Sequence, residues 1–107
     1  MLLNNKVTIV TGGASGIGEA TSRRFAQEGA AVVVADTRLG KAETVAADIN
    51  DNGGHAVAIE VDVADTDSVA ALVDSAVTEF GRLDVMFNNA GTLRPGTVLE
   101  LDVDDWD

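Results

Sequence analysis

The stretch VTIVTGGASGIGEA (Val7–Ala20) constrains the fold more than any other part of the chain. A run of β-branched residues leads directly into four glycines within seven positions, and a segment suited to a helix follows. Glycine loses much conformational freedom on folding, so this cluster indicates that something must come very close to the backbone. A strand that turns through glycines into a helix also presents unpaired N–H groups and a positive dipole end, which together suit an anion such as phosphate.

The remainder of the chain alternates between short apolar runs and segments with helical periodicity. Buried strands are expected at 6–11, 31–36, 56–63 and 83–89, and helices at 17–28, 41–49 and 65–80. Three strand–helix units and a fourth strand, joined by short connections, predict an α/β fold. We expect a doubly wound parallel sheet with right-handed crossovers and helices on both faces.

Local signals predict where these elements end. Gly29 and Gly81 follow two of the expected helices, at positions where glycine commonly ends a helix. Asp65, Thr66 and Asp67 are the candidate N-caps of the third helix. After residue 91 the pattern predicts a loop, with another helix beginning near residue 104. This arrangement leaves the fourth strand as an exposed apolar edge, which favours pairing or aggregation.

The charge balance disfavours some classes of partner. The chain has 18 acidic and 7 scattered basic residues, with a formal net charge of −11, whereas nucleic-acid-binding proteins present basic patches. The acidity indicates a solvated surface, with adaptation to high salt as the alternative. There is no cysteine, so no disulfide or cysteine-based metal site is expected. No apolar run or signal peptide indicates a membrane. We expect a soluble, cytoplasmic protein without a metal, nucleic-acid or membrane partner.

The spacing of the glycines distinguishes between phosphate-binding loops. A Walker A loop ends in Gly-Lys-Ser/Thr, but the sequence here is Gly18-Glu19-Ala20, and a glutamate at the lysine position would repel a triphosphate. The dinucleotide pattern G-x-G-x-x-G does not fit either, because the spacing is Gly12-x-x-x-Gly16-x-Gly18. A nucleoside triphosphatase is therefore disfavoured.

The segment TGGASGIG (Thr11–Gly18) resembles the cofactor loop T-G-x-x-x-G-x-G of the short-chain dehydrogenase/reductase family. Three further features resemble family motifs in the same order along the chain. Asp36 matches the strand-ending acid that selects the cofactor, Val61–Val63 matches the adenine-contacting pair, and Phe87–Gly91 matches the motif N-N-A-G. The resemblance extends over residues 6–106.

This resemblance implies a Rossmann-type sheet with strand order 3-2-1-4, formed by the first four strands of a larger domain. It also implies an NAD(P) site at the carboxyl ends of the strands, where open α/β sheets bind ligands. In the loop it implies Gly12 and Gly16 for the tight turn, Ser15 and Ile17 along the pyrophosphate, and Gly18 where the helix packs against the sheet. The other implied cofactor-binding residues are Asp36 at the ribose, Asp62 and Val63 at the adenine, and Asn89, Ala90 and Gly91 along the ribose and nicotinamide.

Asp36 decides which cofactor is expected. It follows Gly18 by 18 residues, close to the spacing at which an acid accepts hydrogen bonds from the adenosine ribose. Its carboxylate would repel a 2′-phosphate, so NAD is preferred over NADP, and the nearby Arg38 could weaken that preference. Three alternatives stay open: Asp36 as a simple strand-end turn residue, Asp62 as a cap for the following helix, and Asn88 and Asn89 as residues that serve only hydrogen bonding between the sheet and a loop.

No residue of this sequence is assigned a catalytic role. By resemblance, family members transfer hydride between a nicotinamide cofactor and an alcohol or carbonyl substrate. They use a tyrosine as general acid/base, a lysine that lowers the tyrosine pKa, and a serine and an asparagine that orient substrate and proton relay. The sequence has no tyrosine, and its lysines, Lys6 and Lys41, fall at a strand start and on a helix surface.

We therefore expect residues 1–107 to be the cofactor-binding portion of a single-domain oxidoreductase, with its catalytic portion beyond Asp107. The alternative is a non-catalytic dinucleotide-binding module or sensor. A tyrosine and a lysine four residues apart in a continuation of the chain would favour the enzyme. The resemblance also implies a small-molecule alcohol or carbonyl substrate, whose identity these residues do not reveal, and a homo-oligomer at full length.

Overall fold

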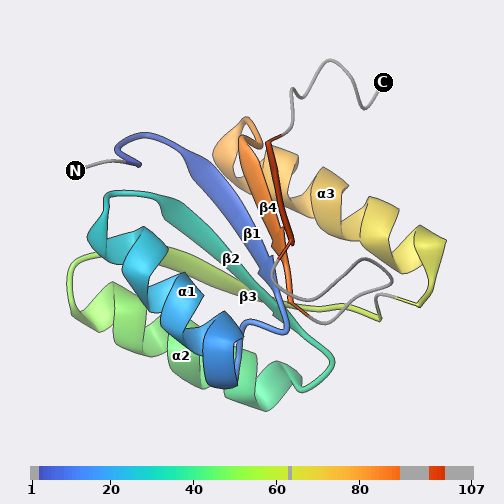
Figure 1. Ribbon diagram of the computed structural model, residues 1–107, viewed down its shortest axis with the longest axis horizontal. Helices are drawn as coiled ribbons and strands as arrows, with labels where there is room; N and C mark the ends of the chain where they lie inside the picture. Colours follow the sequence, from blue (N-terminus) through green and yellow to red (C-terminus); the bar gives the residue numbers. More distant parts are fainter. Residues whose placement is uncertain (1–2, 63, 90–96, 101–107) are drawn as a thin grey trace.

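The computed structural model describes residues 3–62, 64–89 and 97–100, and strands alternate with helices over most of that length (Figure 1). The elements, in chain order, are β1 (Val7–Thr11), α1 (Gly16–Gln27), β2 (Ala31–Asp36), α2 (Leu39–Asp51), β3 (His55–Glu60), α3 (Thr66–Phe80), β4 (Val85–Asn88) and β5 (Thr97–Glu100). Within these described ranges, no helix combines the length and the apolar character needed to cross a membrane.

The strands form one sheet in the order β3-β2-β1-β4-β5, and the first four run parallel. This confirms the predicted order 3-2-1-4. β1 lies at the centre, where Val10 pairs in register with Val34 of β2 and with Phe87 of β4. All five residues of β1 are buried, as expected for a β-branched strand that is covered on both faces.

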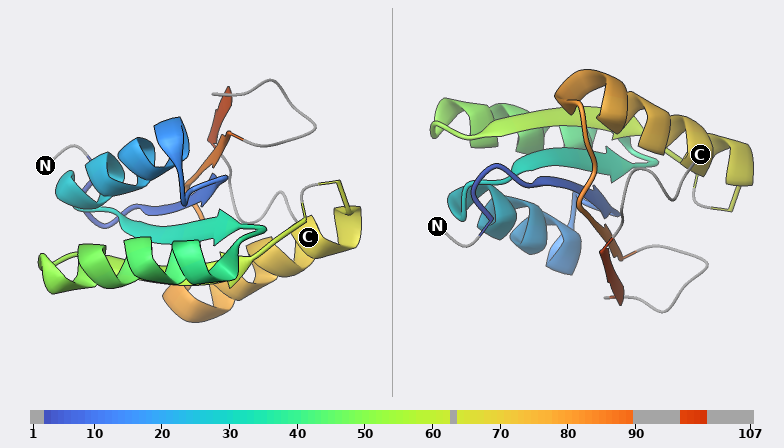
Figure 2. Two further views of the ribbon diagram at one scale, coloured as in Figure 1. Left: turned by 90° about the horizontal axis from the view of Figure 1, so that it is seen from below. Right: turned by 90° about the horizontal axis from the view of Figure 1, so that it is seen from above.

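Helices cover both faces of the sheet, with α1 and α2 on one face and α3 on the other (Figure 2). Successive residues of β1 point into two different hydrophobic clusters, because side chains alternate along a strand. Val10 belongs to the cluster beneath α1 and α2, and Ile9 to the cluster beneath α3. Phe25 of α1 also packs edge-on against Phe87, with ring centroids 6.4 Å apart. These two cores fix the strands, and therefore the positions of the loops that leave them.

Strand β5 corrects two expectations about the segment after the fourth strand. The sequence predicts a loop there and an exposed apolar edge at β4, but Thr97–Glu100 pairs antiparallel with β4, in register from Val85↔Glu100 to Asn88↔Thr97. The physical reason is that an open edge carries unpaired backbone N–H and C=O groups, which the short run TVLE satisfies by returning alongside it. Residues 90–96 of the predicted loop, and the helix predicted near 104, lie outside the described residues.

The helix ends follow the signals in the sequence. Gly29 and Gly81 have φ angles of 94° and 83°, which confirms both as glycine helix ends. Asp65 accepts hydrogen bonds from the backbone N–H groups of Asp67 (2.9 Å) and Ser68 (3.4 Å). Of the three candidate residues, Asp65 is therefore the N-cap of α3.

Three strands are shorter than the sequence predicts. β1 begins at Val7 instead of residue 6, β3 ends at Glu60 instead of residue 63, and β4 begins at Val85 instead of residue 83. The start of β4 has a local cause in Asp84, whose backbone N donates to Val7 O (2.9 Å) while its carboxylate accepts from Val7 N (2.9 Å). A side chain thus takes the place of one backbone partner at the start of the strand pair.

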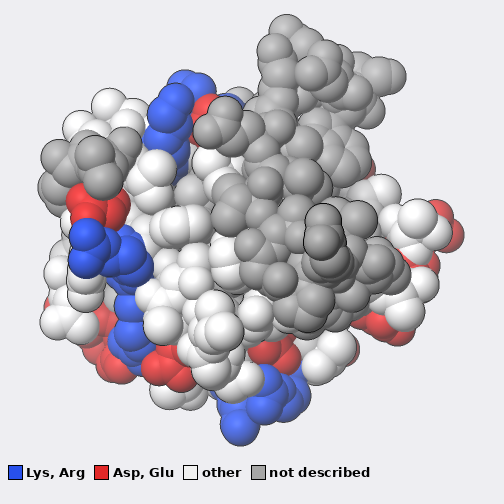
Figure 3. Space-filling view, in the orientation of Figure 1, with Lys and Arg blue, Asp and Glu red and all other residues white. Residues whose placement is uncertain are grey.

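Charged side chains of both signs are mixed on the face shown in Figure 3, where blue basic groups lie beside red acidic ones. Arg23, Arg24 and Arg82 each form an ion pair with a carboxylate, at 2.9, 2.7 and 2.5 Å. Exposed pairs of this kind contribute little to stability, because water and salt screen them. Each of these three basic groups thus lies next to an acidic group, and the three do not form a basic patch.

Candidate functional site

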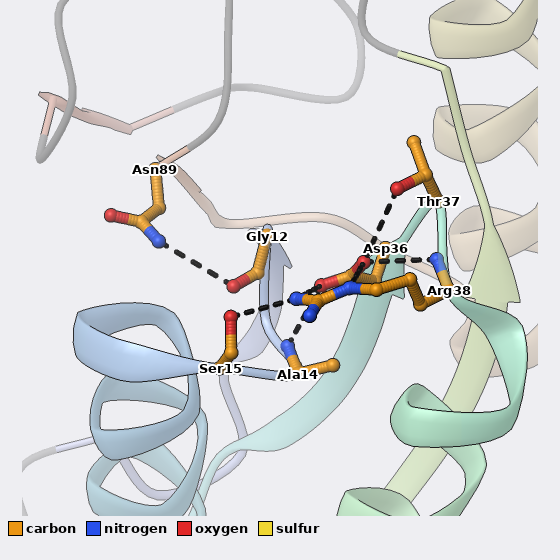
Figure 4. A network of polar contacts seen from close by, with 7 residues as sticks. All are labelled: Gly12, Ala14, Ser15, Asp36, Thr37, Arg38 and Asn89. Atoms are coloured by element: carbon orange, nitrogen blue, oxygen red, sulfur yellow. Dashed lines mark hydrogen bonds and ion pairs between the residues drawn. The ribbon is translucent and has the colours of Figure 1, made fainter.

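The carboxyl ends of β1, β2 and β4 meet at one edge of the sheet, and the loops that leave them are hydrogen-bonded to each other. Gly13 N donates to Ala35 O (3.0 Å), and Ala14 N donates to Oδ2 of Asp36 (3.1 Å), so the loop after β1 is fixed to the end of β2. On its other side, Asn89 Nδ2 donates to Gly12 O (3.4 Å) (Figure 4). The glycine-rich loop is therefore held between the ends of β2 and β4, the strands on either side of β1. It lies at the edge where open α/β sheets bind ligands.

Three glycines of this loop are required for different reasons. Gly12 and Gly16 have φ angles of 63° and 57°, in the left-handed region that glycine adopts at little cost, and this agrees with their predicted turn role. At Gly18 the limit is space, because a Cβ there would lie 1.9 Å from Gly12 O and 2.9 Å from Asn89 Nδ2. Gly18 thus lets the start of α1 lie directly against the loop after β1 and the end of β4.

The start of α1 is open to solvent and is not capped by its own side chain. Ser15 is the N-cap residue with an extended backbone, and its side chain makes no capping hydrogen bond. The first backbone bond of the helix runs from Glu19 N to Ser15 O (3.3 Å), so the N–H groups of residues 16–18 have no acceptor within the helix. Gly16 is exposed, and Ile17 is 68% exposed. Free N–H groups at the positive end of a helix dipole form a site for an anion.

Asp36 brings a carboxylate to the side of this helix start. Its side chain is only 4% exposed, and it accepts hydrogen bonds from the backbone N–H groups of Ala14 (3.1 Å) and Arg38 (2.9 Å). Burial by itself would raise the pKa of the Asp36 carboxyl, but the hydrogen bonds from Arg38 and Ala14 together hold that pKa below its usual value. Asp36 is therefore an ionised acceptor, and it is more than a simple strand-end turn residue because it anchors the glycine-rich loop.

Arg38 also lies at this edge, and the contacts of its side chain could not be predicted from the sequence. Its guanidinium donates to Asp36 through Nε (Oδ1, 3.2 Å) and Nη2 (Oδ2, 3.4 Å), and Nη2 also donates to Ser15 Oγ (2.7 Å) (Figure 4). The only signal available in the sequence is an arginine two positions after an acid that ends a strand. The side chain of Arg38 connects the loop after β2 to the start of α1.

A third set of bonds orders the end of β4. Thr11 Oγ1 donates to Asn88 Oδ1 (3.2 Å) and accepts from Asn89 N (3.1 Å). Thr11 and Asn88 are both buried, so these two residues support the backbone. The side chain of Asn89 is the one that reaches the glycine-rich loop.

The remaining predicted site residues are not brought into this cluster by the described structure. Asp62 is exposed after β3, where Oδ1 accepts from Ala64 N (3.0 Å) and its backbone N donates to Ser68 Oγ (3.0 Å). These bonds order the turn into α3, but the capping alternative for Asp62 is wrong, since Asp65 is the N-cap. Val63, Ala90 and Gly91 lie outside the described residues.

This edge of the sheet presents backbone N–H donors at the start of α1 and one carboxylate acceptor, Asp36, beside them. The open N–H groups of α1 suit an anion, and the Asp36 carboxylate beside them suits hydroxyl groups. In the part of the chain that the structure describes, no three His, Cys, Asp or Glu residues are grouped to hold a metal ion. A ligand with a phosphate next to a sugar hydroxyl fits this arrangement of donors and acceptor.

Comparison with known protein families gives a match over nearly the whole chain. Residues 6–107 match the short chain dehydrogenase family. The chain is 52% identical over 102 residues to cis-4-hydroxycyclohexanecarboxylate dehydrogenase of Sinomonas cyclohexanicum, covering 94% of this chain and 41% of the relative. It is 42% identical over 106 residues to meso-2,3-butanediol dehydrogenase of Serratia marcescens, covering 99% of this chain and 41% of the relative. The chain thus spans about two fifths of the length of these relatives.

Solved structures give the same result for the fold. A short chain dehydrogenase from Mycobacterium avium superimposes with a TM-score of 0.83 at 43% identity, over 88% of this chain and 36% of that protein. A hydroxysteroid dehydrogenase from Escherichia coli superimposes with a TM-score of 0.81 at 38% identity, over 83% of this chain and 38% of that protein. The Rossmann-type arrangement of the first four strands is shared with both.

Proposed function

Because the chain belongs to the short chain dehydrogenase family, we propose that it forms the NAD-binding part of an oxidoreductase that transfers hydride between nicotinamide and an alcohol or carbonyl substrate. One observation carries the proposal. The open N-terminus of α1 and the ionised carboxylate of Asp36 lie side by side at the carboxyl edge of the sheet, joined by the bond from Ala14 N. A dinucleotide presents a pyrophosphate and a ribose in the same relation.

The residues present fit such a cofactor. The N–H groups of residues 16–18 would hold the pyrophosphate, and Asp36 would accept hydrogen bonds from the adenosine ribose. By the family resemblance, Asn89 would lie along the ribose and nicotinamide side, with Ala90 and Gly91, while Asp62 and Val63 would lie at the adenine. When bound, the cofactor supplies the hydride donor or acceptor. This chain's residues bind and orient it. By the family resemblance the general acid/base is a tyrosine, and none of these residues is a tyrosine.

NAD is the proposed cofactor, with NADP as the weaker ligand. An ionised Asp36 would repel a 2′-phosphate, and its lowered pKa means that it carries a charge throughout the neutral range. The names of the relatives, a hydroxycyclohexanecarboxylate dehydrogenase and a butanediol dehydrogenase, favour a small alcohol as substrate and favour an enzyme over a non-catalytic sensor. A homo-oligomeric parent protein in the cytoplasm belongs to the same proposal.

Calorimetric titration of the purified chain with NAD and NADP tests the proposal. We expect NAD to bind more tightly than NADP, and Asp36→Ala to weaken NAD binding at least about tenfold, because hydrogen bonds to a charged acceptor are lost. Asp74→Ala is the matched control, since it removes one exposed acid from α3 and should leave both affinities unchanged. Absence of NAD binding by the unaltered chain would refute the proposal.

A further inference from the structure

We propose that Arg38 competes with the ribose hydroxyls of the nucleotide for the Asp36 carboxylate, so that nucleotide binding displaces the guanidinium. The inference rests on the proposed function, because it assumes that Asp36 faces the ribose. It assigns to Arg38 a control of affinity that the spacing of sequence motifs does not indicate.

The acceptor capacity of Asp36 carries the argument. A carboxylate offers about four lone-pair positions. In this structure they are used by four N–H donors, two from backbone groups and two from the side chain of Arg38. The hydroxyl of Thr37 also donates to Oδ1 (3.5 Å), but this bond is long and the hydroxyl can rotate away to another partner. Incoming hydroxyl donors therefore have no free position on Asp36 while the guanidinium stays.

The two guanidinium bonds are distributed in a way that matches a vicinal diol. Nε donates to Oδ1 and Nη2 donates to Oδ2, so each carboxylate oxygen receives one of them. If the Arg38 side chain leaves, one position becomes free on each oxygen. Those two positions can accept the 2′- and 3′-hydroxyls of a ribose, while the backbone donors of Ala14 and Arg38 keep the carboxylate in place.

Exposure determines which partner moves. The side chain of Arg38 is 46% exposed and that of Asp36 only 4%, so the guanidinium can rotate into water while the carboxylate remains fixed. The exposed guanidinium regains contacts with water when it leaves, and the ribose hydroxyls replace its bonds to the carboxylate, so we take the net cost of the exchange as about 1 kcal/mol, or roughly fivefold in affinity. A ligand can therefore displace Arg38 without breaking the fold.

Arg38 also connects the ribose region to the pyrophosphate region. Its Nη2 lies 2.7 Å from Ser15 Oγ, and Ser15 is the N-cap residue whose side chain makes no capping bond. Displacing the guanidinium thus frees a hydroxyl at the helix start together with the carboxylate. Figure 4 shows the side chain of Arg38 extending between these two groups.

The test uses two nucleotides that differ only in the diol, 5′-AMP and 2′,3′-dideoxy-AMP, titrated into the purified chain by calorimetry. The readout is the diol ratio, which we define as the Kd of dideoxy-AMP divided by the Kd of AMP. Loss of the arginine charge weakens the binding of the two nucleotides equally, because both carry the same phosphate, so this effect cancels in the ratio. We expect Arg38→Ala to raise the diol ratio about two- to fivefold. Arg38→Lys keeps the charge but loses the planar fork, so it should raise the ratio less.

Two controls separate this inference from the proposed function. Arg24→Ala removes a similar charge from the outer surface of α1, where Arg24 pairs with Glu28, and should leave the diol ratio unchanged. Asp36→Ala should bring the ratio to about one, because the carboxylate that both donors share is gone. A chain that binds neither AMP nor NAD contradicts the proposed function itself. A chain that binds both but keeps its diol ratio in Arg38→Ala overturns the competition by Arg38.

A second readout does not depend on substitution. The Nε–H resonance of Arg38 in a nitrogen-15 spectrum should shift on addition of AMP and shift much less on addition of dideoxy-AMP. Equal shifts with the two nucleotides would show that the phosphate, and not the diol, acts on the guanidinium, and would overturn the inference.

Discussion

Helices α1 and α3 both begin at the carboxyl edge of the sheet, yet their first turns are built in opposite ways. α3 begins at a local acid, since Asp65 accepts from the N–H groups of Asp67 and Ser68. α1 begins at Ser15, whose side chain makes no capping bond, and a buried acid from another strand lies beside its loop. A helix start that satisfies its own N–H groups serves stability, whereas one that leaves them open is available to an anionic ligand.

The largest expected effect comes from Gly18, which allows α1 to begin so close to the loop. A Cβ at this position would lie 1.9 Å from Gly12 O, so Gly18→Ala should destabilise the chain by about 3 kcal/mol, because the backbone must move. Gly40→Ala is the matched control, since a Cβ at this position in α2 meets nothing within 4 Å and should stabilise by about 0.5–1 kcal/mol. Urea unfolding of both variants measures the difference. Equal stabilities would contradict the close approach at Gly18.

A second prediction compares the two N-cap residues directly. Asp65→Ala should destabilise the chain by about 1 kcal/mol, as is usual for the loss of a capping side chain. Ser15→Ala should have less than about half that effect, because Ser15 makes no capping bond and its contact with Arg38 is partly exposed. Urea unfolding again provides the measurement. A loss at Ser15 as large as that at Asp65 would show that the start of α1 depends on its own cap after all.

The same comparison explains how much the sequence could predict. The cap of α3 is a local signal, an acid next to the N–H groups it binds, and it was predictable, as were the glycine ends at Gly29 and Gly81. The parallel strands and their crossover helices could be predicted from β-branched runs separated by helical periods, whereas the order of the strands was predicted only by the family resemblance. Strand β5 was missed because a short segment such as Thr97–Glu100 becomes a strand only when an open edge lies beside it.

The predicted site also divides into features with local sequence signals and features that depend on tertiary contacts. The glycines and Asp36 could be located from their spacing, because their roles depend on backbone turns and strand ends. The bridge from Arg38 to Ser15 could not be predicted, since it joins residues 23 positions apart through a long side chain with many rotamers. Nor could the sequence indicate that Ala14 N would bind Asp36, which depends on how β1 and β2 pair.

The smallest expected effect is on the pH dependence of stability, and it tests Asp36, the acid at the end of β2 that lies beside the start of α1. Because hydrogen bonds from Arg38 and Ala14 hold the pKa of Asp36 below its unfolded value near 4, the unfolded chain binds more protons than the folded chain in acid. The contribution of Asp36 to stability is therefore fully present above about pH 4 and is lost as the pH falls through the lower, folded pKa. In Asp36→Asn this contribution is absent at every pH. We expect the difference in unfolding free energy between the two chains to be constant from pH 7 to pH 5 and to shrink as the pH falls below 4, as urea unfolding at each pH would show. A difference that stayed constant down to pH 2 would mean that folding does not shift the pKa of Asp36. A difference that grew in favour of the unaltered chain as the pH fell would mean that the folded carboxyl takes up its proton at a raised pKa, and would remove the electrostatic basis for preferring NAD.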